Sequence, residues 1–163
     1  MATELQYEFF KSMHEAEYLH YGLLEARARL YLTLQTFYLG AVAFKFNDVV
    51  AFTNAYNVPV LPYIAAAVLL LIGLFFTVRA TCIRSYEVPC DLTEIVKSFG
   101  NSPQTDDDFI DQRLGDFAVA SKRNAAVNNR VATWLTGASW LLATAIFLHL
   151  TVFVWAYITQ IKL

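Results

Sequence analysis

Two long stretches of this chain carry no charged side chain, and they limit what the chain can fold into. No Asp, Glu, Lys or Arg occurs between Asp48 and Arg79, or between Arg130 and Lys162. An α-helix needs about 20 apolar residues to cross the ~30 Å hydrocarbon core of a bilayer. Each stretch is therefore long enough to span a membrane. At 57% hydrophobic residues, the chain is also too apolar for an ordinary soluble domain of its size.

The charge pattern predicts an all-α membrane protein with about three transmembrane helices, two of which extend into the cytosol as long helices. The expected segments are a cytosolic amphipathic helix (1–29), a transmembrane hairpin (30–80), a cytosolic helical region (81–130) and a third transmembrane helix (131–163). Within the hairpin we expect spans over residues 30–51 and 60–80. Three membrane helices enclose little space, so the working form is expected to be an oligomer.

Both long cytosolic helices have a recognisable sequence signature. Ser102 followed by Pro103 is typical of a helix N-cap and first turn, so the helix before the third span is expected to begin there. Neither helix contains an interior proline, so both are expected to continue into the membrane without a break. In the N-terminal helix, apolar residues recur at the three- and four-residue steps of one helix face: Leu5, Phe9, Ala16, Leu19, Leu23, Ala26 and Leu30.

Lysine and arginine are distributed unevenly about the expected spans. Ten of them lie before the first span or between the second and third, whereas Lys45 and Lys162 lie on the other side. The positive-inside rule places the basic side in the cytosol, so the N-terminus is expected inside and the C-terminus outside. Cys82 and Cys90 then face a reducing compartment, and we interpret them as structurally incidental.

Combinations that resemble catalytic or metal sites are incomplete. The run from His14 to Tyr18 has a tyrosine where a zinc-protease helix needs its second histidine. The consecutive aspartates at 106–108 lack the alternation of a calcium loop, and the six glycines are scattered singly rather than gathered in a phosphate loop. The sequence therefore predicts no enzymatic activity, no catalytic residue, no metal site and no cofactor.

Polar and small residues form a stripe on the third span. At 100° per residue, four candidate pore-lining residues fall within about 40° of one another: Thr133, Gly137, Thr144 and Thr151. A similar stripe on the first span has the candidates Thr33, Thr36 and Gly40. Two interpretations stay open. The stripes form a seam where membrane helices approach closely, or they line a water-filled pore built from several copies.

Three further predictions concern His149, Lys45 and the second expected span. His149 lies off the stripe, and an intramembrane ionisable group is a functional candidate. A neutral histidine bonded to a neighbouring helix is the simpler interpretation. Lys45 is expected to extend toward the outer interface rather than to pair with Asp48. The second span is almost purely aliphatic and aromatic, so it is expected to face lipid.

Basic residues and asparagines gather where the long cytosolic helices meet the expected spans. Their simplest interpretation is as topology determinants that touch anionic lipid. The alternative is an anion site, repeated around an oligomer axis, in which asparagine amides recognise a phosphate or a nucleobase. The ligand-binding candidates are Arg27, Arg29, Lys122, Arg123, Asn124, Asn128 and Arg130.

The arrangement resembles a known class of membrane proteins. A long charged helix enters a two-span hairpin, and a helix carrying Lys122-Arg123-Asn124 and Asn128-Asn129-Arg130 enters a further span. This resembles the small multi-pass transmembrane effectors of bacterial anti-phage nucleotide-signalling systems, of the Pycsar, SLATT and Hailong types. The resemblance implies an ion channel of the bacterial inner membrane, with a homotetramer favoured, that acts in antiviral defense by membrane depolarisation. It also implies gating from the cytosolic side by a nucleotide or oligonucleotide from a partner nucleotidyltransferase.

Two other functions stay open at this point. A non-conducting membrane scaffold would recruit proteins by helix packing through residues 3–29. A small transporter is a third hypothesis, although the chain lacks the broken helices and duplicated halves that are usual in such folds.

Overall fold

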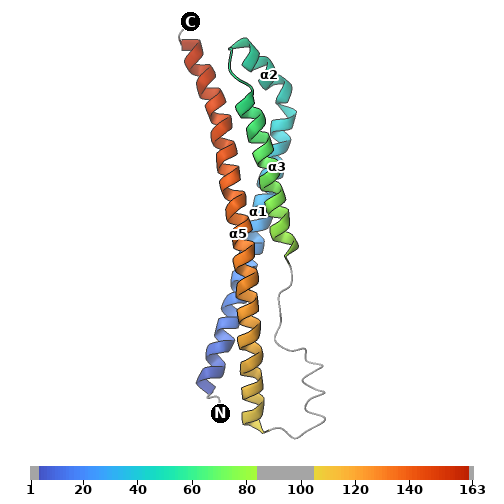
Figure 1. Ribbon diagram of the computed structural model, residues 1–163, viewed down its shortest axis with the longest axis vertical. Helices are drawn as coiled ribbons and strands as arrows, with labels where there is room; N and C mark the ends of the chain where they lie inside the picture. The colour runs from blue at the N-terminus through green and yellow to red at the C-terminus, as the bar shows by residue number, and fades with distance from the viewer. Residues whose placement is uncertain (1–3, 84–104, 162–163) are drawn as a thin grey trace. The chain divides into compact units, whose positions relative to one another are not determined.

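The computed structural model describes residues 4–83 and 105–161, and its helices are drawn in Figure 1. Within these residues the elements are α1 (Glu4–Phe44), α2 (Phe46–Ala55), α3 (Leu61–Cys82) and α5 (Asp106–Ile161), with no strand among them. The all-helical class is therefore confirmed. The proposed helix start at Ser102 and Pro103 lies outside the described residues, as do Cys90 and Lys162.

Helices α1 and α5 are much longer than a membrane is thick. They contain 41 and 56 residues, which at 1.5 Å per residue corresponds to about 62 Å and 84 Å. The hydrocarbon core is ~30 Å thick. Each helix is unbroken over a polar part and an apolar part, as the absence of interior prolines predicted.

The helix ends follow ordinary capping chemistry. Asp108 N–H donates to the Thr105 hydroxyl, and that hydroxyl donates to the Asp108 carboxylate at 2.7 Å, so Thr105 caps α5. α1 ends at Phe44, and Lys45 alone separates it from α2. After α2, Asn57 adopts the left-handed conformation (φ 53°) that asparagine tolerates at a helix C-terminus. The predicted continuous first span over 30–51 is thus interrupted at Lys45.

The chain divides into two compact units. The first unit contains residues 1–25 and 83–131, and the second contains residues 26–82 and 132–163. In the second unit, α1 and α5 run in the same direction and α3 runs against them (Figure 1). Residues that pack from α5 alternate at three and four residues, which is the spacing of a coiled-coil seam: buried Leu135, Ala138, Ala145, His149, Val152 and Ala156, with partly buried Leu142 between Ala138 and Ala145.

The second unit contains the main apolar core. Val42 of α1 packs with Leu70 of α3 and with Val152 of α5 in one buried cluster. One face of α3 is therefore covered by protein, and the prediction that this helix faces lipid is wrong for that face. The covered residues of α3 are Tyr63, Ala66, Leu70, Gly73, Thr77 and Ala80. Small residues at several of these positions let the neighbouring helices approach closely.

In the first unit, α1 pairs with α5 through a face that the sequence analysis did not select. The Tyr7 ring meets the Phe117 ring at 5.7 Å, and Glu17 meets Asn128 further along, so the two helices are parallel. The covered row of α1 is Tyr7, Phe10, His14, Glu17, Tyr21 and Leu24. The apolar row from Leu5 to Leu23 lies exposed. Both rows have the same spacing, and aromatic side chains form the contact with α5.

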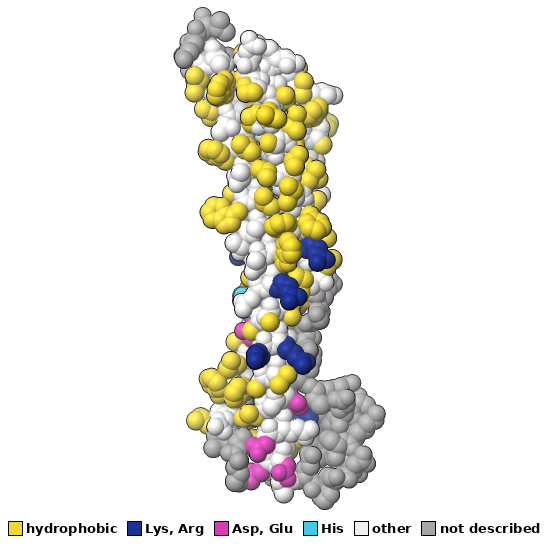
Figure 2. Space-filling view, in the orientation of Figure 1, with side chains coloured by type: hydrophobic (Ala, Val, Ile, Leu, Met, Phe, Trp, Pro, Cys, Tyr) yellow, Lys and Arg dark blue, Asp and Glu magenta, His cyan; other side chains and the backbone are white. Residues whose placement is uncertain are grey.

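Two helices are long and apolar enough to cross a membrane, α3 and α5, with mean hydropathies of 2.4 and 2.0 over their most apolar windows. The shares of these windows buried inside the molecule are 28% and 22%, far below those of a core helix in a soluble protein. Figure 2 shows hydrophobic side chains spread over the visible face of the second unit. The expected first span in α1 is not among these two helices, so three crossings stay a prediction.

Candidate functional site

The polar stripe of α5 lies on the surface of the second unit rather than in its core. Thr144 is exposed and Thr151 is half-buried, whereas the packing seam runs through Leu135, Ala145 and His149. Thr133, just inside the same unit, is also exposed. Packing within one chain therefore does not account for Thr133 and Thr144.

The hydroxyl groups of this stripe are bonded to their own helix. Thr144 donates to the Trp140 carbonyl at 2.8 Å, and Thr151 donates to the Leu148 carbonyl at 2.7 Å. A hydroxyl that donates in this way still has lone pairs that can accept a hydrogen bond. The stripe can therefore face lipid at little cost, and it can also accept hydrogen bonds from water or from another copy of the chain.

Gly137 differs from the threonines because it packs against α3. A Cβ added at this position would lie 2.8 Å from Cδ2 of Phe76. The Phe76 ring in turn meets the Trp134 indole edge-on at 4.8 Å. For Gly137, the helix-packing interpretation of the stripe is therefore the one that the geometry favours.

The candidate stripe on α1 is also exposed. Thr33, Thr36 and Gly40 all lie on the surface of the second unit, and no atom lies within 4 Å of a Cβ added at Gly40. The Thr33 hydroxyl donates to the Arg29 carbonyl at 3.0 Å. Two polar stripes, one on α1 and one on α5, are thus available for contacts outside the chain.

Gln35 of α1 is a buried polar residue and does not belong to the exposed stripe of that helix. Its side chain is fully buried, and the Thr77 hydroxyl lies 2.8 Å from its carbonyl oxygen. Its amide nitrogen approaches the Ala138 carbonyl at 3.5 Å, the limit of a hydrogen bond. Gln35 therefore ties α1 to α3 and reaches α5. The sequence signal for its burial is the spacing: Gln35 lies seven residues after Ala28 and seven before Val42, and both of these apolar residues are buried.

His149 lies in the seam of α5, where it meets two tyrosines. Tyr38 of α1 shares a 2.9 Å hydrogen bond with its Nδ1, and the Tyr63 ring of α3 lies edge-on at 4.7 Å. The Tyr63 hydroxyl donates to the Val42 carbonyl at 2.7 Å. The structure thus agrees with the interpretation of His149 as a residue bonded to a neighbouring helix. The two tyrosines were not predicted.

Lys45 pairs with Asp48, contrary to the prediction that it would extend away from this residue. The Lys45 ammonium lies 2.8 Å from the Asp48 carboxylate, and both side chains are exposed. Since Lys45 is the last residue before α2 begins, the turn places the two side chains on the same side. A surface pair of this kind contributes at most about 1 kcal/mol.

The predicted ligand-binding residues do not all share one environment. Lys122, Arg123 and Arg130 are exposed on α5, whereas Asn124 and Asn128 are buried. The two asparagines therefore do not present their amides on the surface with the basic side chains, and they are removed from the candidate anion site. In the second unit, Arg27 and Arg29 are exposed on α1, and the Arg27 guanidinium donates to the Tyr31 hydroxyl at 3.0 Å.

Asn128 has a structural role in the helix pair of the first unit. Its amide donates to the Glu17 carboxylate at 2.6 Å and to the Glu17 carbonyl at 3.0 Å. A polar pair such as Asn128 and Glu17 at a seam position fixes the register of a parallel coiled coil.

Nearby in the same row of α1, the His14 ring meets the Phe117 ring at 5.7 Å. Burial lowers the pKa of His14, and the adjacent Glu15 carboxylate opposes this shift.

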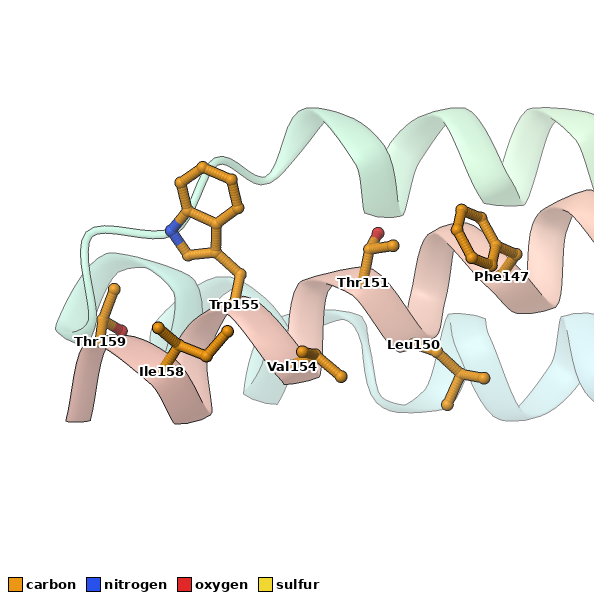
Figure 3. Close-up of a pocket in the computed structure, with 7 residues that line it drawn as sticks. All are labelled: Phe147, Leu150, Thr151, Val154, Trp155, Ile158 and Thr159. Carbon is orange, nitrogen blue, oxygen red and sulfur yellow. The ribbon is translucent and has the colours of Figure 1, made fainter. Parts of the chain in front are cut away.

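A concavity of about 660 Å³ lies along the last turns of α5. Figure 3 shows its lining, which all comes from one helix: Phe147, Leu150, Thr151, Val154, Trp155, Ile158 and Thr159. The hydroxyls of Thr151 and Thr159 both donate to their own backbone, at 2.7 Å and 2.8 Å. The concavity therefore presents a mainly apolar surface on the face that carries the threonine stripe.

Among residues 4–83 and 105–161, no group of three or more His, Cys, Asp or Glu side chains is arranged to hold a metal ion. No protein-family model, curated protein or solved structure matches this chain.

Proposed function

We propose that this chain is an oligomeric ion channel whose pore is lined by the polar stripe of α5, with the stripe of α1 as the second candidate. The observation that carries the proposal is the exposure of Thr133 and Thr144 on a helix whose seam residues, such as Ala145 and His149, already pack within the chain. A hydroxyl stripe on an otherwise apolar span suits a water-lined wall formed by several copies.

The proposed setting is the bacterial inner membrane, with a cytosolic N-terminus and a periplasmic C-terminus. This multi-pass orientation follows from the positive-inside rule applied to the ten basic residues on one side. By resemblance to anti-phage effectors, the channel acts as a homotetramer that depolarises the membrane in antiviral defense. The proposal requires no catalytic residue and no cofactor.

We place the regulatory signal on the exposed basic residues of the first unit, Lys122, Arg123 and Arg130. Guanidinium groups bind phosphate through paired hydrogen bonds, which suits a nucleotide or oligonucleotide made by a partner nucleotidyltransferase. Arg27 and Arg29 are further candidates on α1. Charge reversal at Lys122, Arg123 and Arg130 together should change gating without preventing membrane insertion, and normal regulation in that triple variant would exclude this anion site.

The test of the channel is the membrane potential of expressing cells, read with a voltage-sensitive dye. Depolarisation is expected from the native chain and is expected to be lost in Thr144→Leu and Thr151→Leu, because leucine removes the polar surface of the stripe. Ala143→Leu is the matched control, since Ala143 is exposed but lies about 100° around the helix from Thr144. Depolarisation that persists in both threonine variants would remove α5 from the pore.

A non-conducting scaffold is the second candidate, and one observation favours it. Leu5, Phe9, Leu19 and Leu23 form an exposed apolar row on the polar part of α1, which is suited to recruiting another helix. A stoichiometric foreign protein bound to the native chain, together with an unchanged membrane potential, would support the scaffold over the channel.

A further inference from the structure

The exposed row of α1 is a second coiled-coil seam that the described part of the chain leaves uncovered. Its members alternate at steps of four and three residues from Leu5 through Phe9, Ser12, Ala16, Leu19 and Leu23. The exposed fractions are 81% for Leu5, 59% for Phe9, 68% for Leu19 and 71% for Leu23. At 3.5 residues per turn this row lies about 150° from the row that packs on α5, so both can be occupied at once.

The charges beside the exposed row argue against a membrane surface as its cover. Residues 4–25 of α1 contain three exposed glutamates, Glu4, Glu8 and Glu15, and a single lysine or arginine, Lys11; Glu17 lies in the covered row instead. Amphipathic helices that bind anionic bilayers carry lysine and arginine on the polar face instead. The exposed glutamates beside the row therefore favour a partner surface that carries positive charge.

In the same unit, the outer face of α5 combines exposed small residues with exposed positive charge. Gly115, Val119, Lys122 and Ala126 follow the same four-and-three spacing and are exposed, and a Cβ added at Gly115 would meet no atom within 4 Å. Residues 117–131 contain three exposed basic side chains, Lys122, Arg123 and Arg130, and no acidic residue. The small residues of this face, Gly115 and Ala126, can receive large side chains of the α1 row.

The register of the two faces also matches. Inside the first unit, α1 and α5 pair at an offset of 110 to 111 residues. Copies related by rotation about an axis along the helices keep this offset, which brings Phe9 beside Val119 and Ala16 beside Ala126 of the next copy. In a parallel coiled coil the residue before one seam position pairs with the partner residue five positions further on. Glu8 then faces Arg123, and Glu15 faces Arg130.

We propose that the exposed row of α1 packs against the Gly115–Val119–Ala126 face of α5 in a second copy of this chain, with Glu8 and Glu15 paired to Arg123 and Arg130 of that copy. The contact joins two different faces, so it is head-to-tail, and it forms a ring where the rotation between successive copies closes. The inference rests on the oligomer that the proposed function requires, and it names the interface that assembles that oligomer.

Disulfide cross-linking in membranes of expressing cells tests this contact. In a background with Cys82→Ser and Cys90→Ser, the pair Phe9→Cys with Val119→Cys is expected to give a ladder of covalent species at multiples of the chain mass. Each single cysteine variant is expected to stay monomeric. The pair Lys11→Cys with Val119→Cys is the matched control, because Lys11 lies on another face of α1 at a similar height.

Three outcomes would overturn the proposal: no ladder from the Phe9 and Val119 pair, dimers from either single variant, or cross-links only to a different protein. A charge exchange provides an independent measurement. Glu15→Arg alone and Arg130→Glu alone should each lower the ladder yield roughly twofold to fivefold, and the double exchange should restore it. Failure of the double exchange to restore the yield would exclude the Glu15–Arg130 pair.

Cross-linking and conductance separate the two proposals. A cross-linked ladder without depolarisation would support the proposed interface and contradict the proposed channel. Depolarisation that depends on Thr144, without a ladder, keeps the channel and shows that its copies assemble through another surface. The double charge exchange also separates assembly from signal binding, since it restores the pair but leaves a glutamate where the anion site would need Arg130.

Discussion

At the scale of single residues, burial decides which polar groups act in structure and which remain available. Asn128 and Gln35 are buried and bonded across helices, whereas Thr144 and Arg130 are exposed. Polar groups of the same kind therefore have different roles according to the row of the helix on which they lie. A heptad position identifies this row better than residue type does.

His14 should make the first unit less stable as the pH falls. Its pKa is lowered in the folded chain by burial, so the unfolded chain binds the proton more readily. The stabilising contribution is therefore complete above the ordinary histidine pKa of ~6.5 and is lost below it. Circular dichroism melts in detergent at several pH values should show this loss. His14→Gln should flatten the dependence, whereas His20→Gln, at an exposed position, should leave it unchanged.

Gly137→Ala should destabilise the second unit, although alanine favours a helix over glycine. The added Cβ would lie 2.8 Å from the Phe76 ring, which is itself held against Trp134. We expect a loss of roughly 1 kcal/mol or more, as in other overpacked cores. Gly40→Ala is the control, with an expected gain of about 0.5–1 kcal/mol, because its Cβ would meet no atom within 4 Å. Melting curves from tryptophan fluorescence measure both, and equal stability in the two variants would contradict this account of Gly137.

At the scale of elements, α3 packs against the two long helices, α1 and α5, in the second unit. Each long helix presents one row to its neighbour and leaves other rows exposed. α3 is held by the apolar core and by the buried hydrogen bond that the Thr77 hydroxyl donates to Gln35. Hydrogen bonds between membrane helices contribute on average about 0.6 kcal/mol and at most ~1.7.

The Gln35–Thr77 bond should show asymmetric losses in a double-mutant cycle. Thr77→Val leaves the buried Gln35 carbonyl oxygen without its 2.8 Å donor, whereas Gln35→Leu leaves the Thr77 hydroxyl still able to donate to the Gly73 carbonyl at 3.1 Å. We therefore expect Thr77→Val to lower the melting temperature more than Gln35→Leu, and the double variant to resemble Gln35→Leu. Additive losses would show that the two side chains do not interact in the folded chain.

At the scale of the whole molecule, membrane topology can be tested by chemical labelling. The proposed orientation places Asn54 in α2 outside and Cys82 at the end of α3 inside, and both are exposed. Asn54→Cys, with both native cysteines changed to serine, should react with an impermeant maleimide added from the periplasmic side. Cys82, with Cys90→Ser, should react after the inner membrane is opened. The reverse pattern would invert the topology, and equal reactivity from outside would exclude the hairpin.

Much of the fold follows from short-range pattern in the chain. Charge-free stretches predicted the apolar parts of α3 and α5, and the absence of proline predicted that α1 and α5 are long. These are local properties, since hydrophobicity and helix continuity depend on neighbouring residues alone. The break at Lys45 was missed because no proline or glycine marks it. The number of membrane crossings and the function are still predictions.

By itself, the sequence determined that this chain is helical, that no lysine or arginine lies within its two long apolar stretches and that several rows recur at helical spacing. The tertiary structure decided which row is buried. Leu5, Phe9 and Leu19 form as regular a row as Tyr7, His14 and Glu17, yet the second row faces α5. The physical reason is that periodicity gives the angle between rows, whereas the row that packs depends on the side chains that an adjacent helix presents.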